Sequence, residues 1–269
     1  MTQKHEQLIA ETASIAAIDH TWGNLWREEG TLSGNFFNHR VFLESYPLYC
    51  KYLGHPVPGS RFLEVGTGSG RHGLKFALDN PQMKVVMTDL LPVSAEKVKE
   101  KIAQLHLQNA EVEVCDARVL AYPDASFDVV FSDAVIQYFP DYAVAVKEME
   151  RVLKPGGMLI LSVINWWNLP HLLDKKMLGV NYPWGYEKSF TKKELRSIVE
   201  DAGLRITHED GFAAAYGIYR LKYRHDAFKI IGRIAGRGIK MLDPYLGGVI
   251  SKYFGFQIVV IATKHNEHG

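Results

Sequence analysis

A glycine-rich loop between an expected strand and an expected helix is the first place in this sequence that could do chemistry. The segment reads Glu64-Val65-Gly66-Thr67-Gly68-Ser69-Gly70. Glycine lets the backbone turn tightly and approach a bound molecule without a Cβ clash. A helix start also offers unpaired N–H groups at its positive end. The loop is therefore suited to a ligand that carries a carboxylate or a phosphate.

The G-x-G-x-x-G pattern of dinucleotide-binding folds is also present here, at Gly68, Gly70 and Gly73. That pattern begins at Gly68, whereas the strand ends before Gly66. If the pattern is instead counted from Gly66, directly after the strand, its third glycine position holds Arg71. The spacing therefore disfavours a dinucleotide, although a single glycine match says little by itself.

Two acids follow expected strands. Asp89 ends the second strand, about 20 residues beyond the glycine loop, where a carboxylate can accept hydrogen bonds from the ribose hydroxyls of a nucleoside. Asp116 ends the third strand and could accept a hydrogen bond from the exocyclic amine of adenine. Ligands of open α/β sheets sit at the carboxyl ends of the strands. Both acids are therefore expected to face one crevice, although Asp89 alone does not distinguish between nucleoside cofactors.

The elements that must position these residues alternate along the chain. Short apolar runs at 61–65, 84–89, 111–116, 127–132 and 158–164 predict strands buried on both faces, as in a parallel sheet. Helical patterns fall between them at 69–78, 94–107 and 142–153. A helix at 191–202 begins with the capping-box pair Thr191 and Glu194, and strands follow at 204–208 and 256–263. The chain is predicted to be an α/β protein.

Composition excludes several classes of protein. The chain has 269 residues, a formal net charge of +1 and two cysteines, Cys50 and Cys115, with no CxxC pair. These values give no indication of nucleic-acid binding and fit a reducing compartment. The N-terminal stretch has scattered charges and no long apolar run, so we expect neither a signal peptide nor a membrane span, and a cytoplasmic location. No metal-ligand spacing stands out, so no metal is expected.

Taken in order, the motifs resemble the class I S-adenosylmethionine-dependent methyltransferases, particularly the ubiquinone- and menaquinone-biosynthesis type. The resemblance covers roughly residues 60–164, and the segments are specific in combination. They are the glycine loop, Thr88-Asp89-Leu90, Cys115-Asp116-Ala117, Ser126-Phe127-Asp128-Val129-Val130-Phe131-Ser132 and Glu150-Arg151-Val152-Leu153-Lys154-Pro155-Gly156-Gly157. Relatives often carry two histidines or a Leu-His pair where this chain has Gln137 and Tyr138, which puts a base at that position in doubt.

The resemblance implies a Rossmann-like, doubly wound, mostly parallel seven-stranded sheet whose last strand is antiparallel, and S-adenosyl-L-methionine as cofactor. The glycine loop would lie alongside the methionine moiety of the cofactor, Asp89 would hold the ribose, and Asp116 with Ala117 would hold the adenine. The carbonyl of Ser132 would meet the methionine ammonium. The residues that the resemblance assigns to the cofactor are Glu64, Gly66, Thr67, Gly68, Ser69, Gly70, Asp89, Leu90, Asp116, Ala117 and Ser132.

The remaining chain is expected to cover the acceptor. Residues 1–57 form an aromatic-rich N-terminal helical cap on a methyltransferase domain at 58–269, with insertions at 165–190 and 212–253. A long loop rich in aromatics suggests function rather than disorder. The candidate substrate-binding residues are Trp22, Trp26, Trp166, Trp167, Tyr182, Trp184 and Tyr186. The aromatics favour a small apolar or aromatic acceptor, although ordinary packing against the core stays open for each.

Methyl transfer is an in-line displacement that depends mainly on positioning, and a general base is needed only if the acceptor loses a proton. His171 is the best candidate for a base, although a lone histidine is often only a hydrogen-bonded structural residue. Tyr138 is the second candidate catalytic residue and fits a pocket wall better. The segment 220–240 is basic on one face and apolar on another. It could lie on a membrane or simply cover the sheet as a solvated helix.

Two other functions remain open. The first is methylation of RNA or protein, although the Asn/Asp-Pro-Pro-Tyr/Phe pattern of base-amine methylation is missing after the fourth strand. The second is adenosylmethionine binding without catalysis, because cofactor motifs report binding and not turnover. An NAD-dependent oxidoreductase fails on the glycine frame. We therefore expect a small-molecule acceptor and no nucleic acid, with the oligomeric state left open.

Overall fold

The structure is a computed structural model, and it describes residues 14–28, 32, 36–221 and 227–265. The strands are β1 (Arg61–Val65), β2 (Lys84–Asp89), β3 (Ala110–Val114), β4 (Phe127–Asp133), β5 (Leu153–Ile164), β6 (Leu204–Phe212) and β7 (Gln257–Lys264). The helices include α2 (Ile15–Ile18), α3 (Asn24–Glu28), α4 (Arg40–Leu53), α5 (Arg71–Asp79), α6 (Pro92–Gln104), α7 (Tyr142–Val152), α8 (Leu169–Leu178), α9 (Lys192–Asp201), α10 (Tyr216–Arg220), α11 (Ala227–Leu242) and α12 (Val249–Phe254).

All seven strands form one sheet in the order β3-β2-β1-β4-β5-β7-β6. Neighbouring strands from β3 to β5 are parallel, and β7 is antiparallel to both β5 and β6. The prediction of a Rossmann-like, mostly parallel seven-stranded sheet with an antiparallel last strand is confirmed. Two strands are longer than predicted: β5 starts at Leu153, which pairs with Phe127, and β6 runs to Phe212.

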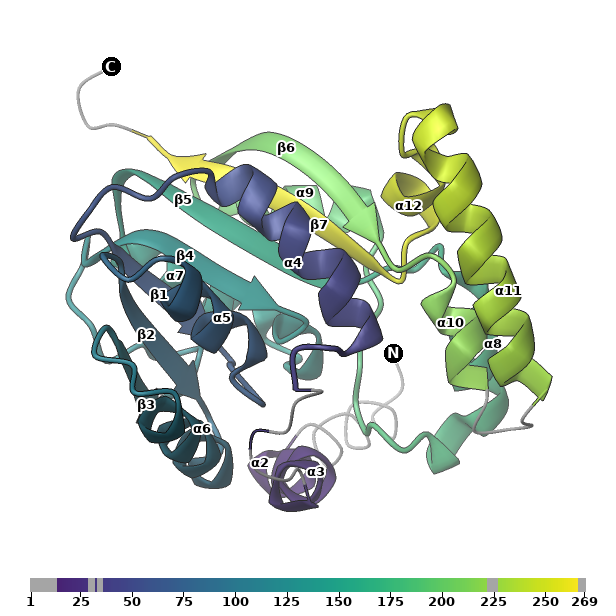
Figure 1. The fold of residues 1–269 in the computed structure, drawn as a ribbon, viewed down its shortest axis with the longest axis horizontal. Coiled ribbons are helices and arrows are strands. Elements are labelled where there is room, and N and C mark those ends of the chain that lie inside the picture. Colours follow the sequence, from purple (N-terminus) through teal and green to yellow (C-terminus); the bar gives the residue numbers. More distant parts are fainter. Residues whose placement is uncertain (1–13, 29–31, 33–35, 222–226, 266–269) are drawn as a thin grey trace.

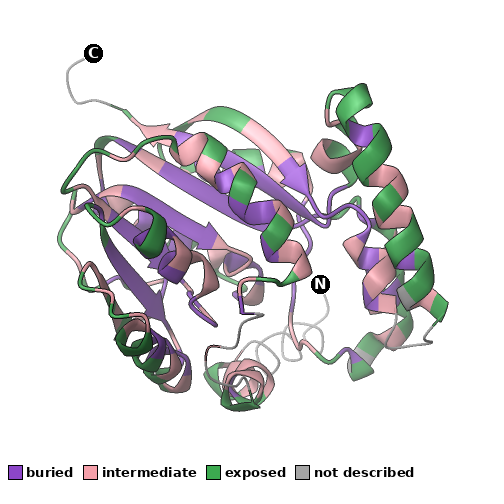
Figure 2. Ribbon diagram, in the orientation of Figure 1, coloured by how far each residue is buried: buried purple, intermediate pink, exposed green. Residues whose placement is uncertain are grey.

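Helices cover both faces of the sheet (Figure 1). Alternate residues of one strand point to opposite faces, so Phe62 packs with α4, α5 and α6, whereas Leu63 packs with α7 and α9. The central strands are buried along most of their length, and the helices are buried only toward the sheet (Figure 2). At the start of α9, Thr191 and Glu194 form the predicted capping box.

The N-terminal helices play two different parts. Helix α4 packs Phe42, Tyr46 and Tyr49 into the same apolar cluster as the strands, so it shares the core of the sheet. Helices α2 and α3, joined by a π-helical turn at Asp19–Gly23, lie beyond the ends of β1 and β2 (Figure 1). The division of the chain at residues 57 and 58 stays a prediction, and residues 1–13 of the predicted cap lie outside the described residues.

The segments predicted as insertions build one end of the molecule. Helix α8 follows β5, and α10, α11 and α12 lie between β6 and β7. Helix α10 packs against both α8 and α11, and α12 packs against β6, so the group lies beside the sheet at the right of Figure 1. Within the described ranges, no helix combines the length and the apolar character needed to cross a membrane.

Candidate functional site

A cavity of about 670 Å³ opens at the carboxyl ends of β1, β2 and β4. Its wall comes from the glycine loop, the residues that follow β2 and β4, the N-terminal helices α3 and α4, and α10. This is the edge at which ligands of open α/β sheets bind. The topology therefore places the glycine loop and the segments that were predicted to cover the acceptor around the same cavity.

The glycine loop lines this cavity with the backbone conformation that glycine allows. Gly66 has φ of +75° and Gly68 has φ of +53°. A Cβ at Gly66 would come 2.4 Å from Val135, and one at Gly68 would come 2.9 Å from Trp26. A side chain at either position would therefore collide with the cavity wall and adopt a strained backbone. Thr67 and Ser69 also line the cavity.

Glu64 lies behind the loop and not in the cavity wall. Its Oε2 accepts hydrogen bonds from Thr67 Oγ1 at 2.6 Å and from the Gly73 N–H at 3.0 Å. Burial raises the pKa of Glu64 to about 8, although both hydrogen bonds oppose this shift. Glu64 therefore ties the loop to the first turn of α5. Gly70, also predicted to contact the cofactor, starts α5 and does not line the cavity.

Asp89 is at the cavity, as predicted, next to Leu90. Its Oδ2 accepts a hydrogen bond from the Gly68 N–H at 2.7 Å, and its Oδ1 accepts one from the Leu91 N–H at 2.9 Å. Burial raises the pKa of Asp89, and these bonds limit the rise. A carboxylate offers about four lone-pair sites, so both oxygens can still accept hydroxyl donors from the cavity.

Asp116 and Ser132, both predicted to contact the cofactor, do not line the cavity wall. The carboxylate of Asp116 is paired with Arg118, at 2.6 Å from Nη2 and 2.9 Å from Nε, and these hydrogen bonds lower its pKa. It does not line the cavity, whereas its neighbours Cys115 and Ala117 do. Ser132 is fully buried, and its hydroxyl donates to the carbonyl of Val65.

Four of the predicted catalytic and substrate residues do meet over the glycine loop: Trp22, Trp26, Tyr138 and Trp184. The ring of Trp22 lies 5.8 Å from that of Trp26 and 5.0 Å from that of Trp184, stacked on both. Tyr138 meets Trp22 edge to face at 5.0 Å. Burial raises the pKa of Tyr138 well above its usual range, so its phenol stays neutral.

Other predicted residues do not reach the cavity. Trp166 and Trp167 are 45% and 52% exposed on the surface, and neither Tyr182 nor Tyr186 lines the cavity wall. Tyr182 is buried and donates a hydrogen bond to Glu187 Oε1 at 2.9 Å.

His171, the predicted base, is fully buried outside the cavity wall, with its Nε2 2.9 Å from Glu187 Oε1. Burial opposes the ionisation of Glu187, but the bond from His171 and the positive charges of Arg220 and Lys175 lower its pKa to about 2. This cluster fastens α8 to the loop at residues 182–187. His171 therefore has a structural position, and the geometry gives it no path to an acceptor.

Sequence reasoning missed a second carboxylate that faces the cavity besides Asp89. Asp133 lines the cavity at the end of β4. Its Oδ1 accepts hydrogen bonds from Tyr49 Oη at 3.0 Å, from Gln257 Nε2 at 2.7 Å and from Ser162 Oγ. Its Oδ2 lies 3.5 Å from Nδ1 of His72. The sequence could have pointed to Asp133, because it ends an expected strand, as do the two acids that were predicted to face the ligand.

His72 also lines the cavity, on the first turn of α5. Its Nε2 lies 2.9 Å from Ser45 Oγ of α4. Burial lowers the pKa of His72 to about 4; neighbouring Arg71 adds to the shift and Asp133 opposes it. The imidazole is therefore neutral near pH 7, beside a carboxylate that holds its orientation.

Two buried donors complete the site. The indole N–H of Trp22 and the amide Nε2 of Gln137 have no hydrogen-bond partner among the described residues, and both residues line the cavity. The Oε1 of Gln137 accepts a hydrogen bond from the Ile164 N–H, which fixes the orientation of the amide. A buried donor without a partner is unfavourable, which makes these two residues candidates for contact with a ligand in the cavity. In the described chain, no three His, Cys, Asp or Glu side chains form a group that could hold a metal ion.

Comparison with known proteins identifies the fold and the chemistry. Residues 56–203 match the family described as a methyltransferase domain. The chain is 30% identical to the demethylmenaquinone methyltransferase of Staphylococcus aureus over 189 residues, which cover 62% of this chain and 76% of that enzyme. It is 38% identical to the enzyme of the same name from Deinococcus radiodurans over 101 residues, which cover 38% of this chain and 42% of that one.

Solved structures agree on the fold. A methyltransferase solved in complex with the Trm112 activator of Haloferax volcanii matches with a TM-score of 0.65 at 18% identity, over 95% of this chain and all of that one. Phosphoethanolamine N-methyltransferase 2 of Haemonchus contortus, solved with S-adenosyl-L-methionine, matches with a TM-score of 0.61 at 19% identity, over 86% and 56% of the two chains. The chain belongs to the class I S-adenosylmethionine-dependent methyltransferases and is similar within them to the ubiquinone- and menaquinone-biosynthesis type.

Proposed function

We propose that this enzyme methylates a small acceptor that has an aromatic or apolar body and at least one hydrogen-bond-accepting oxygen, as a quinone-type molecule has. The observation that carries the proposal is the group of four aromatic rings over the glycine loop, with two unpaired donors beside them. Aromatic walls bind flat apolar molecules, and a few placed polar groups fix their orientation. The demethylmenaquinone methyltransferase relatives support a quinone acceptor.

The cavity fits the cofactor of the family. S-adenosylmethionine supplies a methyl group that is already activated on its sulfonium. The glycine loop lines the cavity with its backbone and lies so close to Val135 and Trp26 that only glycine fits at positions 66 and 68. Asp89 would hold the ribose, and Leu90 with Ala117 would lie against the adenine. Asp116 would need to accept the adenine amine while keeping its pair with Arg118.

Methylation of a neutral acceptor releases one proton, which the chain must accept or pass on. Asp133 and His72 line the cavity as an adjacent carboxylate and imidazole. With a pKa of about 4, the imidazole of His72 is a weak base, so it would hold the proton only briefly, stabilised by the carboxylate beside it, before the proton passes to solvent. We assign the role of proton acceptor to this pair rather than to His171. The aromatic cover excludes water and holds the acceptor in line with the methyl group, which is the main source of rate in such displacements.

The direct test measures transfer of labelled methyl groups to a panel of acceptors. The panel contains a short-chain demethylated naphthoquinol, a hydrophilic catechol, a small amine, bulk RNA and a protein mixture. Turnover of the naphthoquinol supports the proposal. Preference for a hydrophilic acceptor, for RNA or for protein would overturn it, and binding of cofactor without any turnover would favour a non-catalytic binding protein.

Variants of the aromatic cover make the test specific. Trp22→Ala and Trp184→Ala remove cavity walls and should raise KM for the acceptor at least roughly tenfold, since a large buried side chain contributes about 1.5–3 kcal/mol. Trp167→Ala is the matched control, because Trp167 is half exposed and outside the cavity. Equal kinetics in all three variants would contradict the assignment of the acceptor site.

A further inference from the structure

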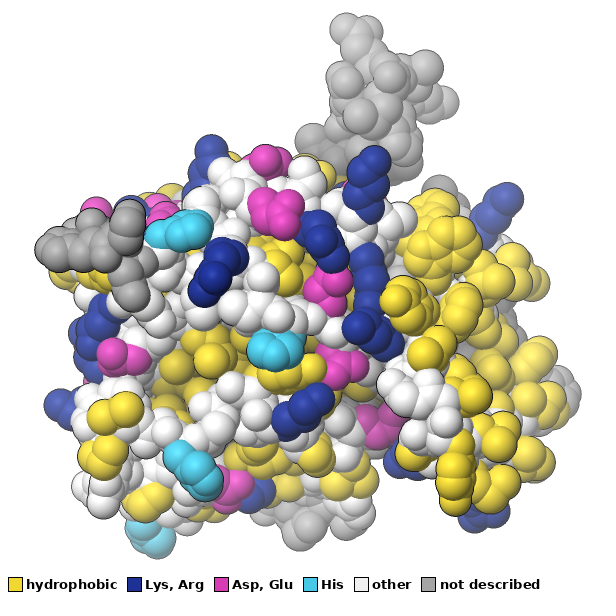
Figure 3. Space-filling view, turned by 90° about the horizontal axis from the view of Figure 1, so that it is seen from above, with side chains coloured by type: hydrophobic (Ala, Val, Ile, Leu, Met, Phe, Trp, Pro, Cys, Tyr) yellow, Lys and Arg dark blue, Asp and Glu magenta, His cyan; other side chains and the backbone are white. Residues whose placement is uncertain are grey.

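A large apolar surface lies at the end of the molecule formed by α11, the 3-10 turn Asp243–Leu246 and α12. Figure 3 shows hydrophobic side chains gathered on this end. Ile234, Met241 and Tyr245 are 64%, 66% and 88% exposed. Contiguous apolar surface of this kind marks an interaction site in a folded protein.

Helix α11 is divided lengthwise into three strips. One strip is buried against α10, where a Cβ at Gly232 would come 2.8 Å from Tyr219. At 100° per residue, Ile230, Ile234 and Met241 fall on the opposite, outward strip. An exposed basic strip runs between the two and contains Arg233 and Arg237, with Lys240 at its edge paired to Glu44 of α4 at 3.2 Å. An outward apolar strip bordered by cations is the pattern of a helix that lies in a membrane interface.

Positive charge is concentrated in this segment. Residues 227–254 contain one acidic residue, Asp243, and five basic ones, whereas the whole chain has a net charge of only +1. Asp243 is buried and accepts hydrogen bonds from the N–H groups of Ile250 and Ser251, so it caps α12 and does not border the apolar surface. The five basic residues are Lys229, Arg233, Arg237, Lys240 and Lys252.

We propose that α11, the 3-10 turn and α12 form a docking surface for an anionic phospholipid bilayer, with α11 lying in the plane of the headgroups. The apolar strip enters the boundary between headgroups and acyl chains, and the basic strip meets the anionic headgroups. A second copy of the chain is the less favourable occupant, because it would bring the same excess of cations to the interface. The inference concerns binding alone and does not depend on the identity of the methyl acceptor.

The docking surface is connected to the catalytic cavity through α10. Tyr216 and Arg220 of α10 line the cavity, and α11 packs on the same helix. Docking would therefore hold the cavity close to the bilayer, where apolar molecules are concentrated.

The test is flotation of the full chain with vesicles of phosphatidylcholine alone or mixed with phosphatidylglycerol. We expect binding to the mixed vesicles that weakens with salt. Ile230→Gln with Ile234→Gln should weaken it roughly tenfold or more. Arg233→Gln with Arg237→Gln should weaken it roughly 30-fold on anionic vesicles. All four side chains lie on exposed positions, so the thermal midpoint should stay at the parent value.

Val57→Gln with Val144→Gln is the matched control, because both valines are exposed apolar residues outside this surface. It should bind vesicles like the parent. Binding that is absent, or that survives the isoleucine substitutions, would overturn the proposal. So would light scattering that shows a dimer which the same substitutions convert to a monomer, since the surface would then be an interface between copies.

Discussion

At the scale of single residues, three acids lie at or just beyond the carboxyl ends of β2, β3 and β4 and have three different surroundings. Asp89 is bonded to backbone N–H groups at the cavity, Asp116 is paired with Arg118 outside it, and Asp133 accepts three side-chain donors inside it. Backbone donors leave the remaining lone pairs for a ligand, whereas a bidentate arginine occupies both oxygens. The position of an acid at a strand end therefore does not by itself decide whether its carboxylate faces the cavity or what it binds.

Asp89→Ala should weaken S-adenosylmethionine binding by roughly 10- to 100-fold, because hydrogen bonds to a charged group contribute about 1.5–3 kcal/mol. Calorimetry measures the affinity, and circular dichroism checks that the fold is retained. Asp201→Ala, on the far end of α9, serves as the control and should bind like the parent. Parental affinity in the Asp89 variant would show that the ribose contact is wrongly assigned.

The lowered pKa of His72 predicts a pH dependence of stability. Its pKa is about 4 in the folded chain and 6.5 in the unfolded reference. Between these values the unfolded chain binds a proton that the native chain does not. Stability is therefore lost as the pH falls from 6.5 to 4, by on the order of 3 kcal/mol from this residue. Urea unfolding of His72→Gln should show a smaller loss over this window.

His55→Gln, at an exposed position, is the matched control for His72→Gln and should keep the parental pH profile. If the profiles of the parent and His72→Gln coincide between pH 4 and 6.5, the imidazole is not buried as described.

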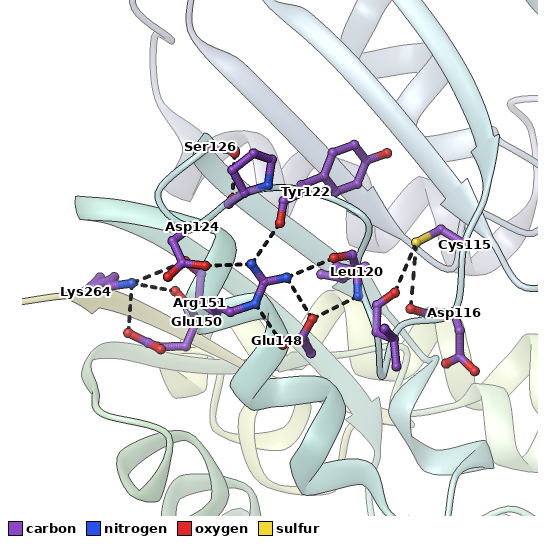
Figure 4. A network of polar contacts seen from close by, with 12 residues as sticks. Cys115, Asp116, Leu120, Tyr122, Asp124, Ser126, Glu148, Glu150, Arg151 and Lys264 are labelled. Carbon is purple, nitrogen blue, oxygen red and sulfur yellow. Dashed lines mark hydrogen bonds and ion pairs between the residues drawn. The ribbon is translucent and has the colours of Figure 1, made fainter.

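At the scale of elements, the loop that carries Ala117 is fastened from behind by α7. Arg151 donates to the carbonyls of Leu120 and Tyr122 at 2.9 and 2.8 Å, and its guanidinium also contacts Asp124 and both oxygens of Glu148 (Figure 4). The guanidinium of Arg151 presents five N–H donors in a rigid planar arrangement, so it can bond several acceptors at once. The ammonium group of a lysine does not offer this geometry. Arg151 therefore positions the loop that leads from Ala117 without lining the cavity itself.

Arg151→Ala should lower the free energy of unfolding by about 2–3 kcal/mol, since it removes several charged hydrogen bonds at once. Thermal or urea unfolding measures the change. Arg196→Ala is the control, because Arg196 makes one exposed ion pair with Glu209 and should change stability by less than about 1 kcal/mol. Equal effects from the two substitutions would refute the anchoring role.

At the scale of the whole molecule, the cavity joins segments that are far apart in the chain. Trp26 comes from α3, Trp184 from the segment after β5, and Arg220 from α10. The sheet supplies the cofactor side of the cavity, and the N-terminal helices and the inserted helices supply the acceptor side. Acceptor specificity can therefore change through the covering segments while the cofactor side stays constant.

The sequence by itself determined the strands and the glycine loop and, through the resemblance to a known family, the sheet topology and the cofactor. The strands and the loop follow from local patterns: short apolar runs, glycines between a strand and a helix, and a capping box at Thr191 and Glu194 that is complete within one helical turn. Asp89 was found because its place at a strand end is also local.

Only the tertiary structure decided which covering residues face the cavity. The sequence nominated Trp166 and His171 equally with Trp184, but one is exposed and one is buried against Glu187. The direction of an aromatic side chain in a long loop depends on how that loop packs against distant helices. No periodic pattern of residues in the sequence predicts this packing. Asp133 and His72 lie side by side because β4 and α5 are adjacent in the fold. Their proposed role in proton transfer depends on this contact.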